Sequence, residues 1–315
     1  MIKVENLSKY FDNFCAVNQI SFTVDAGEVL GFLGPNGAGK STSMKMLTGF
    51  LQPTSGTISI NGHVLPKEAL AAQKEIGYLP EGAPAYADMT VAASLSFIGK
   101  SRGYSGAELQ SRIDHVVAKV ELDSVMHKRI ETLSKGYRRR LGLAQALLHD
   151  PKILILDEPT DGLDPNQKHQ VRELIRNLAK DKIVIVSTHI LEEVSAVCTR
   201  AMILAGGSIV FDGTPEELAA KSDYHNAVVV RLNRVPEALL DSIKALPEVR
   251  ELEQHENEQF IVLPKDGQNI LAQVNRLLHA SDCQVEELHV EVGRLDDVFR
   301  KVTLNQQDQR QHEAV

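Results

Sequence analysis

Residues 34–42 read Gly-Pro-Asn-Gly-Ala-Gly-Lys-Ser-Thr, and this stretch decides the fold. Its spacing is that of a loop that cradles phosphate groups with backbone N–H groups. The apolar run Val29–Leu33 precedes it and the helical pattern of Ser41–Phe50 follows it, which is the strand-loop-helix context that such a loop needs. A helix N-terminus adds partial positive charge at the same place. The sequence therefore predicts a nucleotide-binding site at the end of a buried strand.

Each residue of this loop is a candidate nucleotide contact: Gly34, Pro35, Asn36, Gly37, Ala38, Gly39, Lys40, Ser41 and Thr42. The glycines free the backbone to turn toward the phosphates. Lys40 would bridge the β- and γ-phosphates, Ser41 would bind Mg²⁺, and Thr42 would contact phosphate. By average residue frequencies, the pattern arises by chance in roughly one chain of this length in a hundred, and the surrounding strand and helix make chance rarer still.

Size and composition are those of a globular protein with two domains. The chain has 315 residues, of which 43% are hydrophobic and 24% charged, and a single core rarely grows that large. The formal net charge of −8 and the absence of Trp argue against a general nucleic-acid partner, which would need a basic surface and stacking aromatics. We expect no nucleic acid among its partners.

Cysteines and apolar runs indicate a reduced, cytosolic chain. Cys15, Cys198 and Cys283 are odd in number and far apart, so they form neither a disulfide framework nor a metal cluster. The N-terminal residues do not resemble a signal peptide, and the longest apolar runs have strand length, far below the ~20 residues that span a bilayer. We therefore expect a cytoplasmic protein whose link to a membrane comes from another chain.

Short apolar strands alternate with helical patterns through about the first 220 residues, which predicts an α/β fold with a parallel sheet. The strand candidates are Val29–Leu33, Ile153–Leu156, Ile183–Ser187 and Ala201–Leu204. Three segments that alternate more between apolar and polar residues predict an antiparallel annex: Ile2–Leu7, Cys15–Val24 and Thr57–Ile60. Between residues 87 and 150 the strand signals give way to helical spacing, which indicates a helical insert.

A second domain begins at Ser222, with a pattern that suits a small α+β sandwich. Its order is strand, helix, strand, strand, helix, strand, helix, over Ala227–Leu232, Pro236–Leu246, Val249–Glu253, Gln259–Leu263, Gly267–Ala280, Gln284–Glu291 and Arg294–Thr303. We thus predict a nucleotide-binding domain over residues 1–221, with a helical subdomain at about 87–150, and an accessory domain over 222–304. The polar tail, 305–315, is predicted to be disordered.

Two carboxylates follow the apolar run Ile153–Leu156. In sheets of this kind ligands bind at the carboxyl edge, so Asp157 fits a magnesium-side carboxylate and Glu158 the residue that polarises the attacking water. Alone, such a pair would be solvated charges at a strand end; the phosphate-binding loop favours the functional interpretation. His189 ends another strand, and a neutral His there could donate to a γ-phosphate oxygen, although a single His in this position is more often structural.

A second glycine-bearing turn, Leu133-Ser-Lys-Gly-Tyr137, opens a basic helix. Ser134 is a good N-cap, and Gly136 leaves its backbone N–H approachable at the start of the helix. We interpret the three arginines at 138–140 as a solvated or partner-facing flank rather than a nucleotide contact. By itself, the turn could be that of an ordinary capped helix.

Five segments in chain order resemble the ATPase subunits of ABC transporters, over about residues 1–222: Gly34–Thr42, Leu133–Gly136, Ile153–Glu158, Gly162–Pro165 and Ser187–His189. The resemblance implies that the Ser-x-Gly turn caps the γ-phosphate bound to the loop of a second subunit. Two ATP molecules would then lie between two subunits in a head-to-tail dimer. Ser134 and Gly136 become nucleotide contacts made in trans.

The same resemblance assigns two further nucleotide contacts. Asp164 belongs to the loop that crosses the dimer interface. Phe11 is the aromatic side chain that stacks on adenine, with Tyr10 as the alternative for that role. Either aromatic could instead be an ordinary core residue.

The chain departs from the commoner family pattern at three positions. Glu81 stands where the family usually has a Gln that touches Mg²⁺ and relays closure to the helical insert. The substitution keeps a carboxyl oxygen for the metal but adds a charge. Lys135 and Tyr137 replace the commoner Gly and Gln of the turn, while Ser134 and Gly136, which would make the phosphate contacts, are retained.

Glu81, the form of the turn and an appended domain ending Leu295–Phe299 look like one bacterial subgroup of exporters, close to drug-export and gliding-motility ATPases. The resemblance implies an ATP-hydrolysing subunit that uses Mg²⁺, pairs with a second copy and drives a separate membrane permease from the inner face of the cell membrane. A non-transport ABC ATPase acting in translation or DNA repair is the alternative. The single cassette and the acidic balance favour transport.

Overall fold

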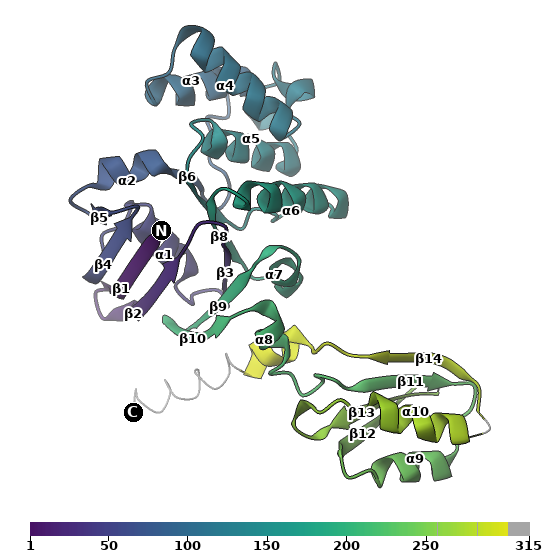
Figure 1. The fold of residues 1–315 in the computed structure, drawn as a ribbon. Helices are drawn as coiled ribbons and strands as arrows, with labels where there is room; N and C mark the ends of the chain where they lie inside the picture. The colour runs from purple at the N-terminus through teal and green to yellow at the C-terminus, as the bar shows by residue number, and fades with distance from the viewer. Residues whose placement is uncertain (257, 282, 302–315) are drawn as a thin grey trace. The chain divides into compact units, whose positions relative to one another are not determined.

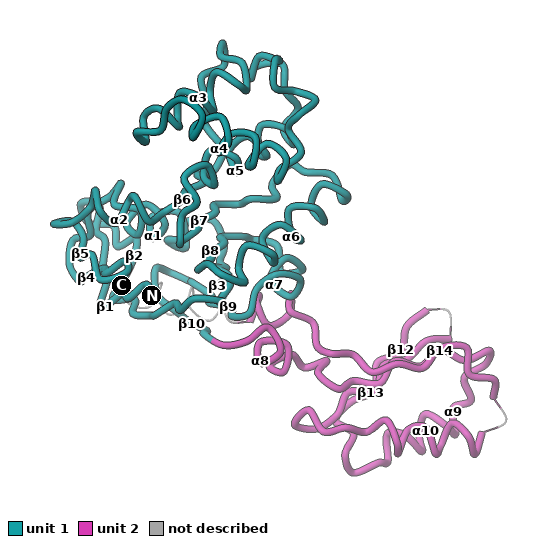
Figure 2. The backbone as a smooth tube through the Cα atoms, turned by 45° about the horizontal axis from the view of Figure 1, so that its top comes forward, with its two compact units in different colours: residues 1–212 teal, residues 213–315 magenta. Residues whose placement is uncertain are grey.

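The computed structural model describes residues 1–256, 258–281 and 283–301. The chain divides into two compact units, residues 1–212 and 213–315 (Figure 2). The boundary predicted at Ser222 lies beyond the short helix α8 (Pro215–Ala219), which the structure groups with the second unit. The predicted tail, 305–315, lies outside the described residues.

A six-stranded sheet forms the centre of the first unit, in the order β10-β9-β3-β8-β7-β6 (Figure 1). Its strands are β3 (Val29–Leu33), β6 (Ile76–Leu79), β7 (Ile153–Asp157), β8 (Ile183–Thr188), β9 (Arg200–Ala205) and β10 (Ser208–Gly213). Every residue of β3, β7 and β8 is buried, as expected for parallel strands covered on both faces. The α/β prediction and its four strand candidates are confirmed.

Parallel register brings the carboxyl ends of three strands to one edge of this sheet. Leu33 at the end of β3 pairs with Thr188 of β8, and Asp157 at the end of β7 pairs with Ser187 of β8. The segments that follow these strands therefore leave the sheet side by side. They carry the phosphate-binding loop, the paired carboxylates and His189.

A second sheet, antiparallel, has the order β2-β1-β4-β5. Its strands are β1 (Ile2–Phe11), β2 (Phe14–Val24), β4 (Ser55–Ile60) and β5 (His63–Leu65), which confirms the predicted annex. One apolar cluster joins this sheet to the main sheet and to α1 (Lys40–Leu47); it includes Val17, Phe32 and Met44. The rings of Phe22 and Phe32 meet edge to face across this core, with centroids 5.3 Å apart.

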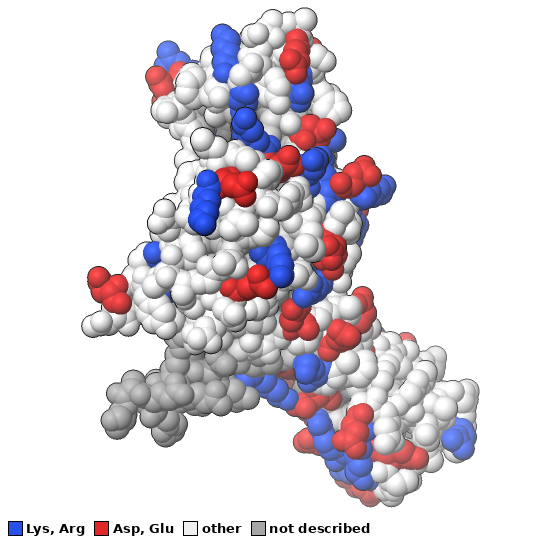
Figure 3. All heavy atoms as spheres, turned by 60° about the vertical axis from the view of Figure 1, so that its left-hand side comes forward, with Lys and Arg blue, Asp and Glu red and all other residues white. Residues whose placement is uncertain are grey.

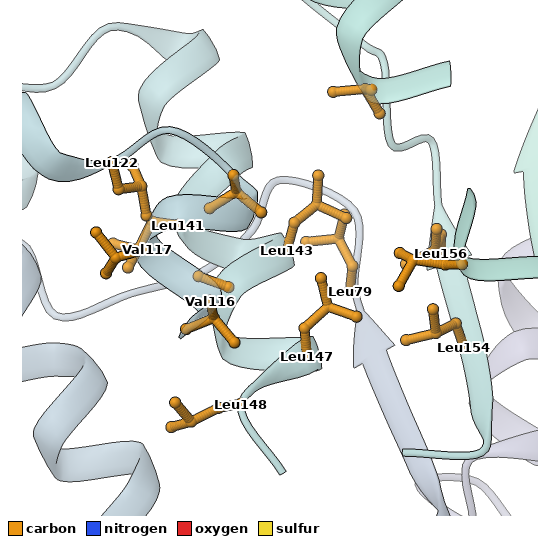
Figure 4. Packing of buried hydrophobic residues seen from close by; sticks show 14 of the residues in the cluster. Leu79, Val116, Val117, Leu122, Leu141, Leu143, Leu147, Leu148, Leu154 and Leu156 are labelled. Atoms are coloured by element: carbon orange, nitrogen blue, oxygen red, sulfur yellow. The ribbon is translucent and has the colours of Figure 1, made fainter. Parts of the chain in front are cut away.

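Three helices form the predicted insert: α3 (Val91–Ser101), α4 (Gly106–Lys119) and α5 (Lys135–Leu147). Two short 3₁₀ turns, η1 (Asp123–Val125) and η2 (Ile130–Thr132), lie between α4 and α5. Figure 4 shows Leu143 and Leu147 of α5 between Val116 of α4 on one side and Leu154 of β7 on the other. Helix α5 is therefore held by the insert and by the main sheet at once.

The remaining helices of the first unit connect its strands. Helix α2 (Ala69–Glu75) precedes β6, while α6 (Pro165–Ala179) and α7 (Leu191–Val197) lie before and after β8 in the chain and pack on it. Among the described residues, no helix combines the length and the apolar character that a membrane crossing requires.

The second unit contains a four-stranded antiparallel sheet in the order β12-β13-β11-β14. Its elements are β11 (Val228–Leu232), α9 (Glu237–Lys244), β12 (Val249–His255), β13 (Gln259–Pro264), η3 (Lys265–Gly267), α10 (Leu271–Ala280) and β14 (Val285–Val290). This is the strand order of a ferredoxin-like split βαβ unit. Helices α9 and α10 share one apolar cluster with the sheet. Residues 295–301 are helical, and the rest of the last predicted helix lies outside the described residues.

Candidate nucleotide site

The phosphate-binding loop contains left-handed backbone conformations at two of its glycines. It runs from the end of β3 at Leu33 to the start of α1 at Lys40. Gly37 has φ +80° and Gly39 has φ +102°, in the left-handed region that L side chains rarely adopt. A Cβ at Gly39 would also lie 2.5 Å from the Ala16 carbonyl oxygen. Gly39 is therefore required both by its backbone conformation and by the space around it, and Gly37 by its backbone conformation.

Lys40 is buried at the base of this loop, with 7% of its surface exposed. Its ammonium group donates to the Gly34 carbonyl at 2.6 Å and to the Pro35 carbonyl at 3.3 Å. Burial lowers the pKa of Lys40, and the nearby carboxylates of Glu158, Asp157 and Glu81 oppose that shift. The side chain is thus a cation held at the loop by two backbone carbonyls.

A cavity of about 490 Å³ opens beside the loop. The predicted site residues that line it are Phe11, Asn36, Gly37, Ala38, Gly39, Lys40, Ser41, Thr42, Glu81, Glu158 and His189. Three lining residues were not predicted: Phe14, Ala16 and Asp161. Gly34 and Pro35 do not line it but hold Lys40, and Asp157 is 1% exposed behind it. One chain therefore gathers most of the predicted nucleotide contacts around a single cavity.

Two aromatic side chains, not one, stand at the mouth of this cavity. Phe11 and Phe14 are paired across the turn that joins β1 to β2, and both line the cavity with about half of their surface exposed. Tyr10, the alternative to Phe11, is not among the lining residues. The Lys9 ammonium lies 5.1 Å from the Phe11 ring centroid. Of the two aromatic candidates, Phe11 therefore lines the cavity, with Phe14 beside it, and Tyr10 does not.

The two carboxylates at the end of β7 have separate surroundings. Ser187 of β8 donates its hydroxyl to the carboxylate of Asp157. The backbone N–H of Glu158 donates to both the Oγ and the carbonyl oxygen of Ser187, each at 3.1 Å. Glu158 has φ +52°, a left-handed conformation that is rare for a residue with a side chain. Its Oε2 lies 2.8 Å from Nδ1 of His189. Both the backbone and the carboxylate of Glu158 are therefore anchored.

Burial and a hydrogen bond shift the pKa of the Glu158 carboxyl group in opposite directions. Burial raises the pKa of its carboxyl group, while the hydrogen bond and the charge interaction with His189, and the charge of Lys40, lower it. The net shift is upward. A carboxyl group that has a raised pKa and lines a cavity is suited to accept a proton from a molecule bound there.

A buried carboxylate behind the cavity ties two of these loops together. Glu193 of α7 is 4% exposed and accepts hydrogen bonds from the hydroxyls of Thr160 and Thr188. Thr160 follows Glu158 in the chain, and Thr188 precedes His189. No local sequence pattern marks Glu193, because its partners are hydroxyl groups from two different loops, with the Arg172 guanidinium 4.0 Å away.

The oxygen groups near the loop fit a magnesium ion that also binds phosphate. Ser41 and Glu81 line the cavity, and Asp157 lies at the adjacent strand end. In the described part of the chain, no group of three or more His, Cys, Asp or Glu side chains is arranged to hold a metal ion. Mg²⁺ prefers oxygen ligands and is usually held by one or two carboxylates together with phosphates and water, so this donor set suits it only when a nucleotide is present.

Ser134, Gly136 and Asp164 lie apart from the cavity that the other residues line. Ser134 caps α5, since its Oγ accepts from the Tyr137 N–H at 3.4 Å. Asp164 caps α6 in the same way, accepting from the Gln167 N–H at 2.9 Å. Such caps stabilise a helix by about 1 kcal/mol. Their own chain thus gives Ser134 and Asp164 helix-capping contacts and no contact with the cavity.

The prediction for the three arginines of α5 was wrong for Arg139. Its side chain is 5% exposed and donates to the carbonyl oxygens of Pro80, at 3.3 Å, and Glu158. Arg138 instead bonds to the Leu133 carbonyl at 3.1 Å, and Arg140 to the carboxylate of Glu121 at 2.6 Å. A hydrophobic pattern cannot reveal that a guanidinium group is buried against distant backbone carbonyls.

Comparison with known proteins agrees with this site. The family model "ABC transporter" matches residues 17–161. The linearmycin resistance ATP-binding protein LnrL of Bacillus subtilis (strain 168) is 34% identical over 305 residues, which cover 96% of this chain and 98% of that protein. The Nod factor export ATP-binding protein I of Burkholderia lata is 36% identical over 308 residues, 96% of each chain.

Solved structures agree as well. That of cbiO1 from Clostridium perfringens, described as part of the ABC transporter complex cbiONQ, has a TM-score of 0.63 and 28% identity, and the match covers 70% of this chain and 90% of that one. The alignments with LnrL and with the Nod factor protein run through both units. This chain therefore belongs to the ATP-binding subunits of ABC transporters, and it is an ATPase.

Proposed function

We propose that this chain pairs head to tail with a second copy, hydrolyses ATP at two sites that the dimer completes, and drives export through a separately encoded permease. One observation carries the proposal: Ser134 and Gly136 do not line the cavity of their own chain. A turn of this kind needs a second subunit to reach a nucleotide. Two-fold symmetry then gives both sites the same composition.

The residues around the loop supply charge and ligands for the nucleotide. Lys40 would exchange its bonds to the Gly34 and Pro35 carbonyls for bonds to the β- and γ-phosphates. Ser41, Asp157 and Glu81 would hold Mg²⁺, which neutralises charge on the phosphate oxygens when it is bound.

Glu158 is the residue that we assign to the attacking water. His189 holds one oxygen of its carboxylate, which leaves the other free to turn toward a water molecule in the cavity. Phosphoryl transfer requires mainly positioning and charge stabilisation. A side chain fixed at its backbone and at one carboxylate oxygen meets the first of these requirements.

The names of the relatives support export through a membrane partner. LnrL is named for linearmycin resistance, the Burkholderia protein for Nod factor export, and cbiO1 for its place in a transporter complex. We propose that this chain likewise works at the inner face of the cell membrane, bound to a permease, and moves cargo outward.

A pair of exposed aromatic rings is the contact that we assign to the permease. Tyr86 is 63% exposed and Phe97 45%, and their rings meet edge to face with centroids 5.8 Å apart. Exposed apolar groups of this kind often mark a protein partner. Tyr86 follows Glu81 in the chain, so nucleotide state at the cavity can be passed to this contact over a short segment.

The alternative, an ABC ATPase of translation or DNA repair, has less support. On the face drawn in Figure 3, the Lys and Arg side chains of the described residues are interspersed with Asp and Glu, without a broad basic area. Nucleic-acid binding relies on such an area. The charge of −8 points the same way.

The first prediction concerns catalysis. Glu158→Gln should bind ATP and form ATP-dependent dimers, but hydrolyse ATP about 10²-fold more slowly, because the amide orients water poorly and accepts no proton. Phosphate release and light scattering measure the two effects. Glu192→Gln, at an exposed residue of α7, is the matched control. Near-normal turnover in Glu158→Gln would refute the assigned role.

The second prediction concerns pH. Burial raises the pKa of Glu158, and the ionised form is required, so kcat/KM should fall as the pH drops through this raised pKa. His189 lowers that pKa, so His189→Ala should move the acid limb to higher pH. The pH profile of kcat/KM, which reports on the free enzyme, measures the shift. An acid limb that stays in place or moves to lower pH would contradict the pairing.

The third prediction concerns the dimer. Ser134→Arg should leave ATP binding intact and abolish ATP-dependent dimers, because a bulky cation replaces the small hydroxyl group that would meet the partner's γ-phosphate. Light scattering with ATP detects dimers, in a background that hydrolyses slowly. Ser134→Thr, which keeps the hydroxyl and the helix cap, should still dimerise. If the Arg variant dimerises normally, the turn is only a cap.

The fourth prediction concerns the permease. Co-expressed with a candidate multi-span permease, the wild-type chain should be retained in the membrane fraction, and Tyr86→Asp should not, because a charge is placed in an apolar contact. Val292→Asp, at a residue 70% exposed in the second unit, is the control. Equal retention of both variants would exclude the aromatic pair. Tight RNA or DNA binding by the purified chain would instead favour the alternative function.

A further inference from the structure

Arg139 connects helix α5, which begins at the Ser134-x-Gly136 turn, to the carboxyl edge of the main sheet. It is one of few charged side chains buried in the described residues, at 5% exposure. One terminal nitrogen of its guanidinium, Nη1, donates to the Pro80 carbonyl at 3.3 Å, and the second, Nη2, donates to the Glu158 carbonyl. Pro80 directly follows β6, and Glu158 directly follows β7. A single side chain of α5 therefore holds the first backbone groups beyond two neighbouring strands.

These two carbonyl groups belong to sensitive positions. Pro80 precedes Glu81, which lines the cavity at the position where the family usually has Gln. Glu158 has φ +52°, so the direction of its carbonyl is not that of ordinary strand or helix backbone. Its N–H bonds to Ser187, and its carbonyl accepts the Asp161 N–H at 3.1 Å in addition to Arg139. Of these anchors, Arg139 alone comes from the helical insert.

The charge environment explains why an arginine tolerates burial here. Burial lowers the pKa of Arg139, and the carboxylates of Asp161, Glu158, Asp157 and Glu81 oppose the shift. The planar guanidinium offers several N–H donors in a fixed geometry, so that it can reach two carbonyls at once. A lysine has one charged nitrogen on a flexible stem and matches this geometry less well.

We infer that Arg139 is a positioning residue for hydrolysis: it fixes the backbone of Glu158, and of Pro80 beside Glu81, to helix α5. Any shift of α5 relative to the sheet is thereby transmitted to the carboxylate that orients the attacking water. Arg139 itself touches neither nucleotide nor water in this assignment. The inference rests on the proposed role of Glu158, and it adds a route by which the helical insert controls that role.

The test compares two arginines of the same helix. Arg139→Ala should lower kcat for ATP about 10- to 100-fold, the size of loss that a displacement of about 1 Å can cause, with KM for ATP changed by less than about threefold. Arg140→Ala removes the same charge from α5, but its contacts are Val120, Glu121 and Gln170. It should leave kcat within about twofold.

Conservative variants separate positioning from general stability. Arg139→Lys and Arg139→Gln keep N–H donors near the two carbonyls but lack the rigid two-nitrogen fork of the guanidinium, and both should recover part of the lost kcat. Titration with ATP shows that a variant is folded at the site. If Arg139→Ala does not fold, these two variants carry the test. Wild-type kcat in a folded variant that cannot bond both carbonyls would overturn the inference.

A double-mutant cycle distinguishes failure of the inference from failure of the proposed function. If Arg139 acts through Glu158, adding Arg139→Ala to Glu158→Gln should reduce single-turnover hydrolysis much less than it does in the wild type. Equal losses in the two backgrounds would overturn the route through Glu158. Normal turnover in Glu158→Gln alone would instead refute the proposed role of Glu158, and with it the premise of the inference.

Discussion

The whole site depends on one arrangement, the position of β8 between β3 and β7 in parallel register. Because Leu33 pairs with Thr188, and Asp157 with Ser187, three loops leave the sheet within strand spacings of about 5 Å. These loops carry the phosphate-binding segment, the two carboxylates and His189. They are distant in sequence, and the register of the buried strands is what brings them to one cavity.

Glu158 shows how this arrangement is converted into a held side chain. A left-handed backbone at a non-glycine residue costs about 1–3 kcal/mol and persists only where the surroundings determine it. Here Ser187 holds the N–H, Arg139 holds the carbonyl and His189 holds the carboxylate. Glu193 adds a second layer by bonding to Thr160 and Thr188. The strain at Glu158 is thus sustained by several elements rather than by its own conformational preference.

The sequence could predict those features that depend on residues close together in the chain. The phosphate-binding loop and the buried strands were predicted because glycine spacing and apolar runs are local patterns. Phe14 could have been found, since a two-residue turn after Phe11 pairs the two rings across a hairpin. Arg139 and Glu193 could not, because no periodicity records a buried polar contact. Arg139 bonds to the carbonyls of Pro80 and Glu158, and Glu193 to the hydroxyls of Thr160 and Thr188.

The predicted boundary between the domains raises the same issue. Helix α8 lies before Ser222 in the chain, yet a Cβ at Gly293 would lie 2.2 Å from the Ala219 carbonyl oxygen. The N–H of Arg294 donates to Ser222 Oγ at 2.9 Å. Contacts between 219–222 and 293–294 close the second unit on itself, and a change of composition along the chain does not reveal such closure.

Helix α5 links the Ser134 turn at its start to the backbone of Glu158. Ser134 caps its first turn, and Arg139 follows five residues later, about 140° further around the helix axis at 3.6 residues per turn. In the proposed dimer, the cap meets the nucleotide of the partner while Arg139 faces inward to the backbone of Glu158 in its own chain. A force on the first turn therefore acts on the same helix that holds Glu158, the residue that we propose to orient the attacking water. In this proposal, helix α5 lets each subunit hydrolyse its own ATP in response to the ATP bound by the other.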